Sequence, residues 1–106
     1  MSESNWSENE KQAAKEAFNR AYKREINSLV SEVQQKASEI SEINEIWRLH
    51  DFLSAKRHDI DGKYDYQYPM LIFTFARLLQ EGGVHLDDLQ VLERDKLAKI
   101  TALARM

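Results

Sequence analysis

The sequence predicts an all-α protein, and three observations support this fold class. Its 106 residues include only three glycines and one proline, while residues that lose little freedom in a helix are abundant. Apolar residues recur at steps of three and four from Ala14 to Ile40, which is the spacing of one helix face. The run MLIFTF could form a strand, but a lone strand would have no partner in this chain. We therefore expect a single domain over residues 1–106, with a long two-helix stalk at about 7–62 and a small helical head at about 69–106.

The first predicted helix begins at Ser7, because Ser7 and Glu10 have the spacing of a capping box. Its apolar face consists of Ala14, Phe18, Ala21, Tyr22, Ile26, Leu29, Val30, Val33, Ala37 and Ile40. No glycine or proline interrupts the pattern before Ser38, so the helix would be roughly 45 Å long at about 1.5 Å per residue. A globule of this chain length has a radius of gyration of only about 13 Å, so the helix should overhang its own domain.

An apolar stripe on an overhanging helix needs a cover, because contiguous exposed apolar patches mark association surfaces. A homodimer, in which each copy covers the stripe of the other, is the simplest arrangement. The alternative is that other helices of the same chain cover the whole stripe.

The second predicted helix can be capped by Ser41 and Asn44 and ends at Gly62, a residue suited to a left-handed C-cap. We expect four apolar residues to supply its buried side: Ile46, Leu49, Leu53 and Ile60. The opposite side carries Trp47 together with four polar residues at helical spacing: His50, Asp51, Ser54 and His58. A tryptophan on a polar face is typical of a protein interface, although it could instead pack against the head or the opposite helix.

The stretch GKYDYQYP is predicted to connect the stalk and the head, because Pro69 lacks an amide donor and disfavours helical geometry at Tyr68. The following MLIFTFARLLQE is apolar almost all round, which predicts a helix buried in the head. The glycine pair at 82–83 should end that helix. The aspartates at 87–88 suit the first turn of a final helix whose apolar positions are Leu89, Leu92, Leu97, Ile100 and Leu103.

Composition and motifs exclude several functional classes. The chain has no cysteine, which excludes disulfides and thiolate chemistry, and no apolar run long enough for membrane insertion, so we expect a cytoplasmic protein. His50 and His58 lie eight residues apart and lack the i, i+4 spacing with which one helix face binds a metal. The glycine pair at 82–83 lacks the lysine and hydroxyl residue of a phosphate-binding loop. We therefore expect no metal, no cofactor and no enzymatic activity.

Four segments carry a resemblance to a known family: FNRAYKREI, WRLHDFLSAKRHDIDGKYD, IFTFARLL and LERDKLAKITALARM. They resemble the fluorescence recovery protein family, over nearly the whole chain. The resemblance implies an all-α dimer with an antiparallel stalk and a head. It also implies a non-enzymatic regulator of photoprotection in cyanobacteria, whose partner is the orange carotenoid protein.

In that family the factor binds the photoactivated red form of the partner, mainly through the partner's C-terminal domain. It speeds reversion to the orange form and detachment from the phycobilisome, the light-harvesting antenna, which ends non-photochemical quenching. The residues that the family uses for dimerisation and partner binding match Trp47, His50, Asp51, Arg57, Phe73 and Lys99. The carotenoid stays in the partner, so no cofactor is implied for this chain.

Asp51 and Arg57 are six residues apart and therefore point in different directions on one helix, so we expect their ion pair to form across a dimer. A different client remains an alternative. A helical dimer could bind nucleic acid through Lys56, Arg57, His58 and Lys63, but acidic neighbours and a net charge of -3 argue against it. A heterodimeric coiled coil is disfavoured because strict heptads are missing.

Overall fold

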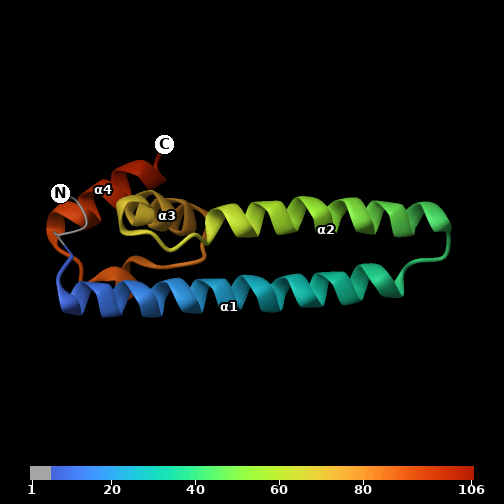
Figure 1. Ribbon diagram of the computed structural model, residues 1–106, viewed down its shortest axis with the longest axis horizontal. Coiled ribbons are helices and arrows are strands. Elements are labelled where there is room, and N and C mark those ends of the chain that lie inside the picture. The colour runs from blue at the N-terminus through green and yellow to red at the C-terminus, as the bar shows by residue number, and fades with distance from the viewer. Residues whose placement is uncertain (1–5) are drawn as a thin grey trace.

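Helices make up the fold of this computed structural model, which describes residues 6–106 and contains no strand within them. The elements are α1 (Glu8–Ser38), α2 (Ile43–Lys63), α3 (Tyr68–Glu81), the 3-10 helix η2 (Leu86–Leu89) and α4 (Arg94–Ala104). The molecule is elongated, with principal extents of 53 × 24 × 22 Å. Figure 1 shows α1 and α2 as a long antiparallel hairpin, with α3 and α4 gathered at one end. The all-α prediction is confirmed.

The first helix begins where the capping box predicted. The Ser7 side chain accepts a hydrogen bond from the backbone N–H of Glu10 at 3.1 Å, and the Glu10 carboxylate accepts one from the N–H of Ser7 at 2.9 Å. After α1, a short turn reverses the chain, and the Glu45 carboxylate accepts hydrogen bonds from the N–H groups of Ser41 and Glu42 at 3.0 Å each. The second helix therefore starts on a glutamate cap rather than on Ser41 or Asn44.

The predicted end of the second helix at Gly62 is wrong. Gly62 lies inside α2, which continues to Lys63, and the left-handed C-cap occurs instead at Gly82, with φ of 82°, where α3 ends as predicted. Lys63 is buried and forms ion pairs with neighbouring helices, so tertiary contacts hold the last turn of α2 beyond the glycine. The expectation that Pro69 keeps Tyr68 out of a helix is also wrong. The third helix begins at Tyr68, and Pro69 occupies its first turn, where a missing N–H costs nothing.

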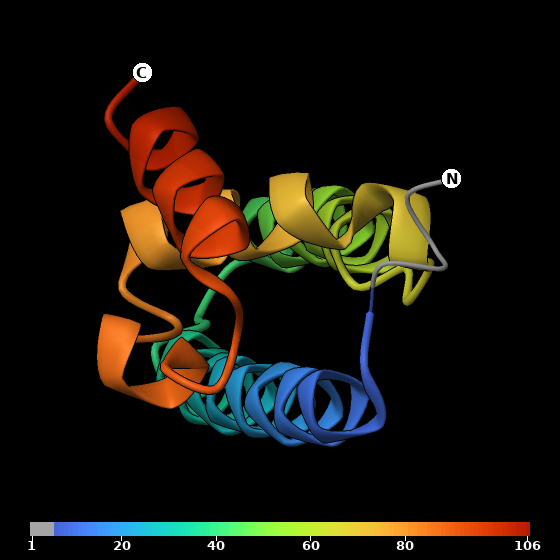
Figure 2. The same ribbon diagram turned by 90° about the vertical axis from the view of Figure 1, so that its left-hand side faces the viewer.

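The hydrophobic core lies in the head and includes the first half of α1. Its fully buried side chains come from α3, the following loop, η2 and α4: Leu71, Phe75, Leu78, Val84, Leu89 and Ile100. Ala14, Ala17, Phe18 and Ala21 pack into the same cluster from α1, and Trp6 joins it just before the helix. Figure 2 shows α4 crossing α3 on one side while α1 runs beneath the head. The core thus draws on residues from both ends of the chain.

Two predictions for the head need correction. The third helix is not buried all round, because Met70 and Phe73 are 50% and 55% exposed. The final helix does not begin at the aspartates 87–88, which lie in η2, but at Arg94 after a loop. Leu89 and Leu92 are both buried, and the backbone N–H of Glu93 donates to the Glu10 carboxylate at 2.8 Å, so core packing and a bond to α1 fix the later start.

The α1 stripe is only partly covered by the same chain. Ile26, Leu29 and Val33 are half-buried, whereas Tyr22, near the head, and Val30, farther along the hairpin, are 43% and 49% exposed. Neither a bare stripe nor complete coverage by the chain's other helices is therefore observed.

Candidate protein-binding surface

The second helix carries apolar side chains on two sides. Leu49 and Phe52 face α1, where the ammonium group of Lys36 lies 4.7 Å from the centre of the Phe52 ring. The other side, which we call the outward stripe, exposes Ile43, Ile46, Trp47 and Leu53 by 58, 42, 58 and 37%. The prediction that Ile46 and Leu53 supply burial is thus wrong for a single chain, because α1 reaches only one side of α2. Exposed apolar groups in this pattern indicate an association surface.

Polar residues accompany the outward stripe. The side chains of Asp51 and Arg57 are 83% and 86% exposed. Asp51 lies 3.3 Å from the neighbouring His50 ring, and the Arg57 guanidinium lies 3.8 Å from Asp61. Asp51 and Arg57 therefore have separate neighbours within α2, and both remain accessible to a second molecule.

The two predicted head residues lie apart from the stalk group. Phe73 and Met70 are exposed one turn apart on α3, which gives the head a small apolar patch of its own. Lys99 on α4 lines a cavity of about 340 Å³ together with Trp6 and Tyr68, whose rings lie 6.0 Å apart. The predicted residues thus divide into a stalk group on α2 and a head group on α3 and α4.

A charged cluster centred on the buried Lys63 joins the head to the stalk, and the sequence pattern did not reveal it. Lys63, with a side chain only 3% exposed, lies 2.8 Å from both Glu25 of α1 and Glu81 of α3. Arg77 of α3 binds the same Glu81 at 2.9 Å and Asp59 of α2 at 2.6 Å. Charges from three helices therefore meet at one point and fix the orientation of α3 against the hairpin.

The cluster shifts the pKa of its members. Burial opposes the charge on Lys63, but hydrogen bonds to Glu25 and Glu81 outweigh it, so the pKa of the lysine is raised. Burial likewise disfavours the Glu81 carboxylate, yet Lys63 and Arg77 lower its pKa below the usual value. The hydrogen bond from Arg77 lowers the pKa of Asp59. Lys63, Glu81 and Asp59 are therefore held in their charged forms.

A second network anchors the start of α1. The Glu10 side chain is buried and accepts hydrogen bonds from the N–H groups of Ser7 and Glu93 and from the Lys96 ammonium at 3.2 Å. Burial alone would raise the pKa of Glu10, but these bonds lower it. Lys96 also lies 5.1 Å from the centre of the Trp6 ring. The capping box was visible in the sequence, but its link to α4 was not.

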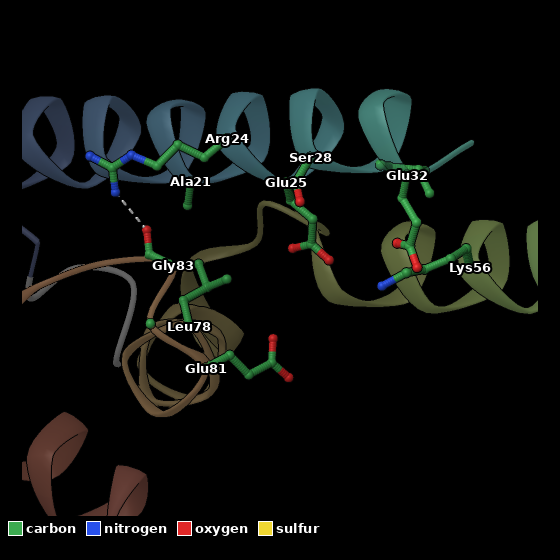
Figure 3. A pocket seen from close by; sticks show the side chains of 11 residues that line it. Ala21, Arg24, Glu25, Ser28, Glu32, Lys56, Leu78, Glu81 and Gly83 are labelled. Carbon is green, nitrogen blue, oxygen red and sulfur yellow. Dashed lines mark hydrogen bonds between the residues drawn. The ribbon is translucent and has the colours of Figure 1, made fainter. Parts of the chain in front are cut away.

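A cavity of about 340 Å³ lies between α1, α2 and the end of α3. Figure 3 shows the side chains that line it. Arg24 donates to the Gly83 carbonyl at 2.9 Å at one side, and Glu25, Glu32, Lys56 and Glu81 surround the rest. Across residues 6–106, no group of three or more His, Cys, Asp or Glu side chains is placed to hold a metal ion. None of the helices in the described part of the chain combines the length and apolar character needed to span a bilayer.

The sequence profile of the family described as photoprotection regulator fluorescence recovery protein matches residues 6–104. The chain belongs to this family. It is 52% identical over 104 residues to the fluorescence recovery protein of Synechocystis sp. PCC 6803, a match that covers 98% of this chain and 95% of that protein.

Two solved structures are also similar. The fluorescence recovery protein of Fremyella diplosiphon superimposes with a TM-score of 0.93 at 56% identity, over 95% of this chain and 99% of that one. The Synechocystis structure gives 0.92 at 52% identity with the same coverage. The resemblance noted in the sequence is confirmed, and membership of the fluorescence recovery protein family makes this chain a photoprotection regulator.

In this member of the fluorescence recovery protein family, the basic residues considered for nucleic-acid binding do not form one patch. Lys63 is enclosed by carboxylates and cannot reach a phosphate, Arg57 lies beside Asp61, and Lys56 turns toward the cavity between α1 and α2. The geometry therefore gives no support to the nucleic-acid alternative.

Proposed function

We propose that this chain, as a homodimer, binds the red, light-activated orange carotenoid protein and accelerates its return to the orange form. Detachment of that partner from the phycobilisome then ends photoprotective quenching. The observation that carries the proposal is the outward stripe, with the Trp47 indole 58% exposed on a face that a lone chain leaves in water. Membership of a photoprotection-regulator family supports the same partner.

No covalent step is required of such a regulator. A factor that accelerates a conformational relaxation must bind the transition state, or a compact intermediate, more tightly than the starting state. The stalk and the head offer separate surfaces, so one can hold the partner's C-terminal domain while other contacts help the two domains of the partner come together.

The dimer is supported by the composition of the outward stripe. Trp47 combines large contact area with low entropy cost, and the exposed Asp51 and Arg57 are free to pair with Arg57 and Asp51 of a second copy. An isologous two-fold contact satisfies both pairs at once. We place Trp47, His50, Asp51 and Arg57 in this interface, and Phe73 and Lys99 in the surface that meets the carotenoid protein.

The direct test is the dark decay of the red carotenoid protein, followed by absorbance with and without this chain. We expect a clear acceleration by the wild type. Phe73→Ala and Lys99→Ala should reduce the acceleration at least about tenfold while leaving the oligomeric state unchanged, since interface anchors carry most of the binding energy. The control is Val91→Ala, a 56% exposed position on the loop before α4.

An unchanged decay rate at saturating concentration would contradict the proposal. In parallel, a gel shift at low salt tests the nucleic-acid alternative. Tight, steeply salt-dependent binding would favour that alternative, because phosphate contacts release counterions.

A further inference from the structure

Arg77 joins α3 to the stalk through two sides of its guanidinium group. Its Nε donates to the Glu81 carboxylate of the same helix at 2.9 Å, and a terminal nitrogen donates to the Asp59 carboxylate of α2 at 2.6 Å. A guanidinium group is planar and its donors have fixed directions, so the bond to Glu81 sets the orientation of the group relative to α3. The bond to Asp59 then ties that orientation to α2.

The second helix takes no part in the packing that holds α3. Within residues 6–106, the hydrophobic core cluster takes its members from α1, α3, η2, α4 and the adjoining loops, and none of them lies in α2. Three apolar residues of α2 line cavities with residues of α1 instead: Leu49, Phe52 and Ile60. Figure 1 shows α3 at the head end of α2. Charged side chains therefore link the two helices there, through Arg77 and Asp59 and through Lys63 and Glu81.

The same arginine lies beside the exposed apolar patch of α3. Arg77 follows Phe73 by four residues and Met70 by seven, so the three side chains lie along one face of the helix. All three are exposed, whereas the core side of α3 is fully buried. A change in the tilt of α3 against α2 would therefore move Phe73 relative to the stalk.

We propose that Asp59 and Arg77 are positioning residues for recovery, because their bond sets the place of the Phe73 patch relative to the stalk. This proposal rests on the proposed function and adds two residues that act without touching the carotenoid protein. A contact contributes to the rate only if it is stronger in the transition state than in the starting state, which requires correctly placed surfaces. A loose joint between α2 and α3 lets the head bind the red form but lowers the rate of its conversion.

Asp59 can be replaced without leaving a buried charge alone. The side chains of Asp59 and Arg77 are 40% and 43% exposed, and Arg77 keeps Glu81 when Asp59 is removed. Lys63 is less suitable, because its side chain is buried and its removal would leave the Glu25 carboxylate without its cation. Since exposed ion pairs contribute little to stability, Asp59→Ala should fold and dimerise like the wild type.

The test measures two quantities in the dark decay of the red carotenoid protein. One is the acceleration at a saturating concentration of this chain, and the other is the concentration that gives half of it. For Asp59→Ala we expect the first to fall roughly threefold or more, while the second stays within about twofold. Asp59→Glu keeps the charge and should remain close to the wild type.

Glu32→Ala is the matched control. The Glu32 side chain is 46% exposed and pairs with Lys36 of the same helix at 3.9 Å, so its removal breaks an ion pair that joins no two helices. Both quantities should stay at their wild-type values. A direct contact behaves differently from a positioning residue, and Phe73→Ala should raise the half-saturating concentration.

Three results would overturn the positioning role: a wild-type maximum for Asp59→Ala, a change confined to its half-saturating concentration, or an equal loss in Asp59→Glu. Loss of the dimer in Asp59→Ala, measured by light scattering, would also overturn it. These results leave the proposed function standing as long as the wild type accelerates the decay. A wild type without any acceleration overturns both.

Arg77→Lys provides a second reading that does not depend on Asp59→Ala. Lysine keeps the positive charge but replaces the fork of donors with one ammonium group, which cannot fix a direction between Glu81 and Asp59. We expect a lower maximum, an unchanged half-saturating concentration and thermal unfolding close to that of the wild type. Should Asp59→Ala fail to fold, this variant decides, and a wild-type maximum for Arg77→Lys contradicts the proposal.

Discussion

Glu10 illustrates how one side chain serves two levels of structure. Its position three residues after Ser7 predicts the start of α1, and the capping box is present. The same carboxylate also accepts hydrogen bonds from the Lys96 ammonium group and from the backbone N–H of Glu93, which lie more than eighty residues away in the sequence. The local role could be predicted from spacing, whereas the distant one depends on packing of the head, which a single sequence does not show.

Replacing Glu10 should therefore lower the free energy of unfolding by more than the loss of a helix cap alone would. In Glu10→Gln the buried Lys96 loses a charged partner, and we expect the free energy of unfolding to fall by about 1–3 kcal/mol. Urea unfolding followed by circular dichroism measures the change. Glu8→Gln is the matched control, since the Glu8 side chain is 93% exposed and its removal should change stability by no more than about 0.5 kcal/mol. Equal effects of the two variants would contradict this account.

Stability should decline at both ends of the pH scale. Glu10 and Glu81 have pKa values below the usual 4.5, so their contribution is present above about pH 4.5 and is lost as the pH falls through the folded pKa. Burial raises the pKa of Tyr66 from 10.0 to about 12, so its contribution is complete below pH 10 and is lost as the pH rises toward 12. The midpoint of urea unfolding, measured across pH, reports the losses of stability at acid and at alkaline pH. A midpoint that stays constant below about pH 4 contradicts the stabilising role of the Glu10 and Glu81 carboxylates.

The helices differ in how well local signals predicted their ends. Gly82 ends α3 because its φ of 82° suits a residue without a Cβ, and the sequence identified this stop correctly. Gly62 has the same residue type but stays helical, because the buried Lys63 cluster holds the last turn of α2 in place. A glycine thus allows a helix to end, and tertiary contacts decide whether the helix ends there.

The two glycines should respond oppositely to alanine. Gly82→Ala forces a Cβ into left-handed geometry and should destabilise the protein by about 1–2 kcal/mol. Gly62→Ala adds a methyl group with nothing within 4 Å in a helix and should stabilise it by about 0.4–1 kcal/mol. Thermal unfolding of the two variants measures the signs. Stabilisation by Gly82→Ala, or a loss of stability with Gly62→Ala, would refute the argument.

On α2, the exposed polar and aromatic residues of the outward stripe should matter for association rather than for folding. In the proposed dimer, Asp51→Leu would leave Arg57 of the second copy without its partner, and Trp47→Ala would remove a large aromatic contact. For Asp51→Leu we expect dimerisation to weaken by about 3–5 kcal/mol if the pair is partly buried there. Sedimentation at micromolar concentration measures this, and recovery assays should show a parallel loss. Unchanged sedimentation together with unchanged recovery would remove both residues from the interface.

At the scale of the whole molecule, the sequence predicted helices, a stalk and a head, but not how they meet. The continuous stripe of α1 indicated one long apolar face, yet its first half belongs to the head core and its second half lies along α2. Trp6 lies outside any periodic pattern, so its place in the core could not be predicted. Periodicity reports which side of a helix is buried, and it does not report which partner buries it.

The same limit applies to the binding surface. Trp47, His50, Asp51 and Arg57 were predicted to share one region of α2, and their exposed side chains are available there. The cavity that Phe18 and Tyr22 of α1 line together with Asp61 of α2 could not be predicted, because it forms only when the two helices come together. The spacing of residues within one helix does not show which residues of another helix lie beside it.

The most direct test of this account is the mass of the protein in solution, measured by light scattering over a dilution series at neutral pH. The central claim is that a second copy covers the outward stripe. We expect the mass of two chains at tens of micromolar, with dissociation on dilution and a higher dissociation constant for Trp47→Ala. A folded single chain throughout the series would contradict the claim.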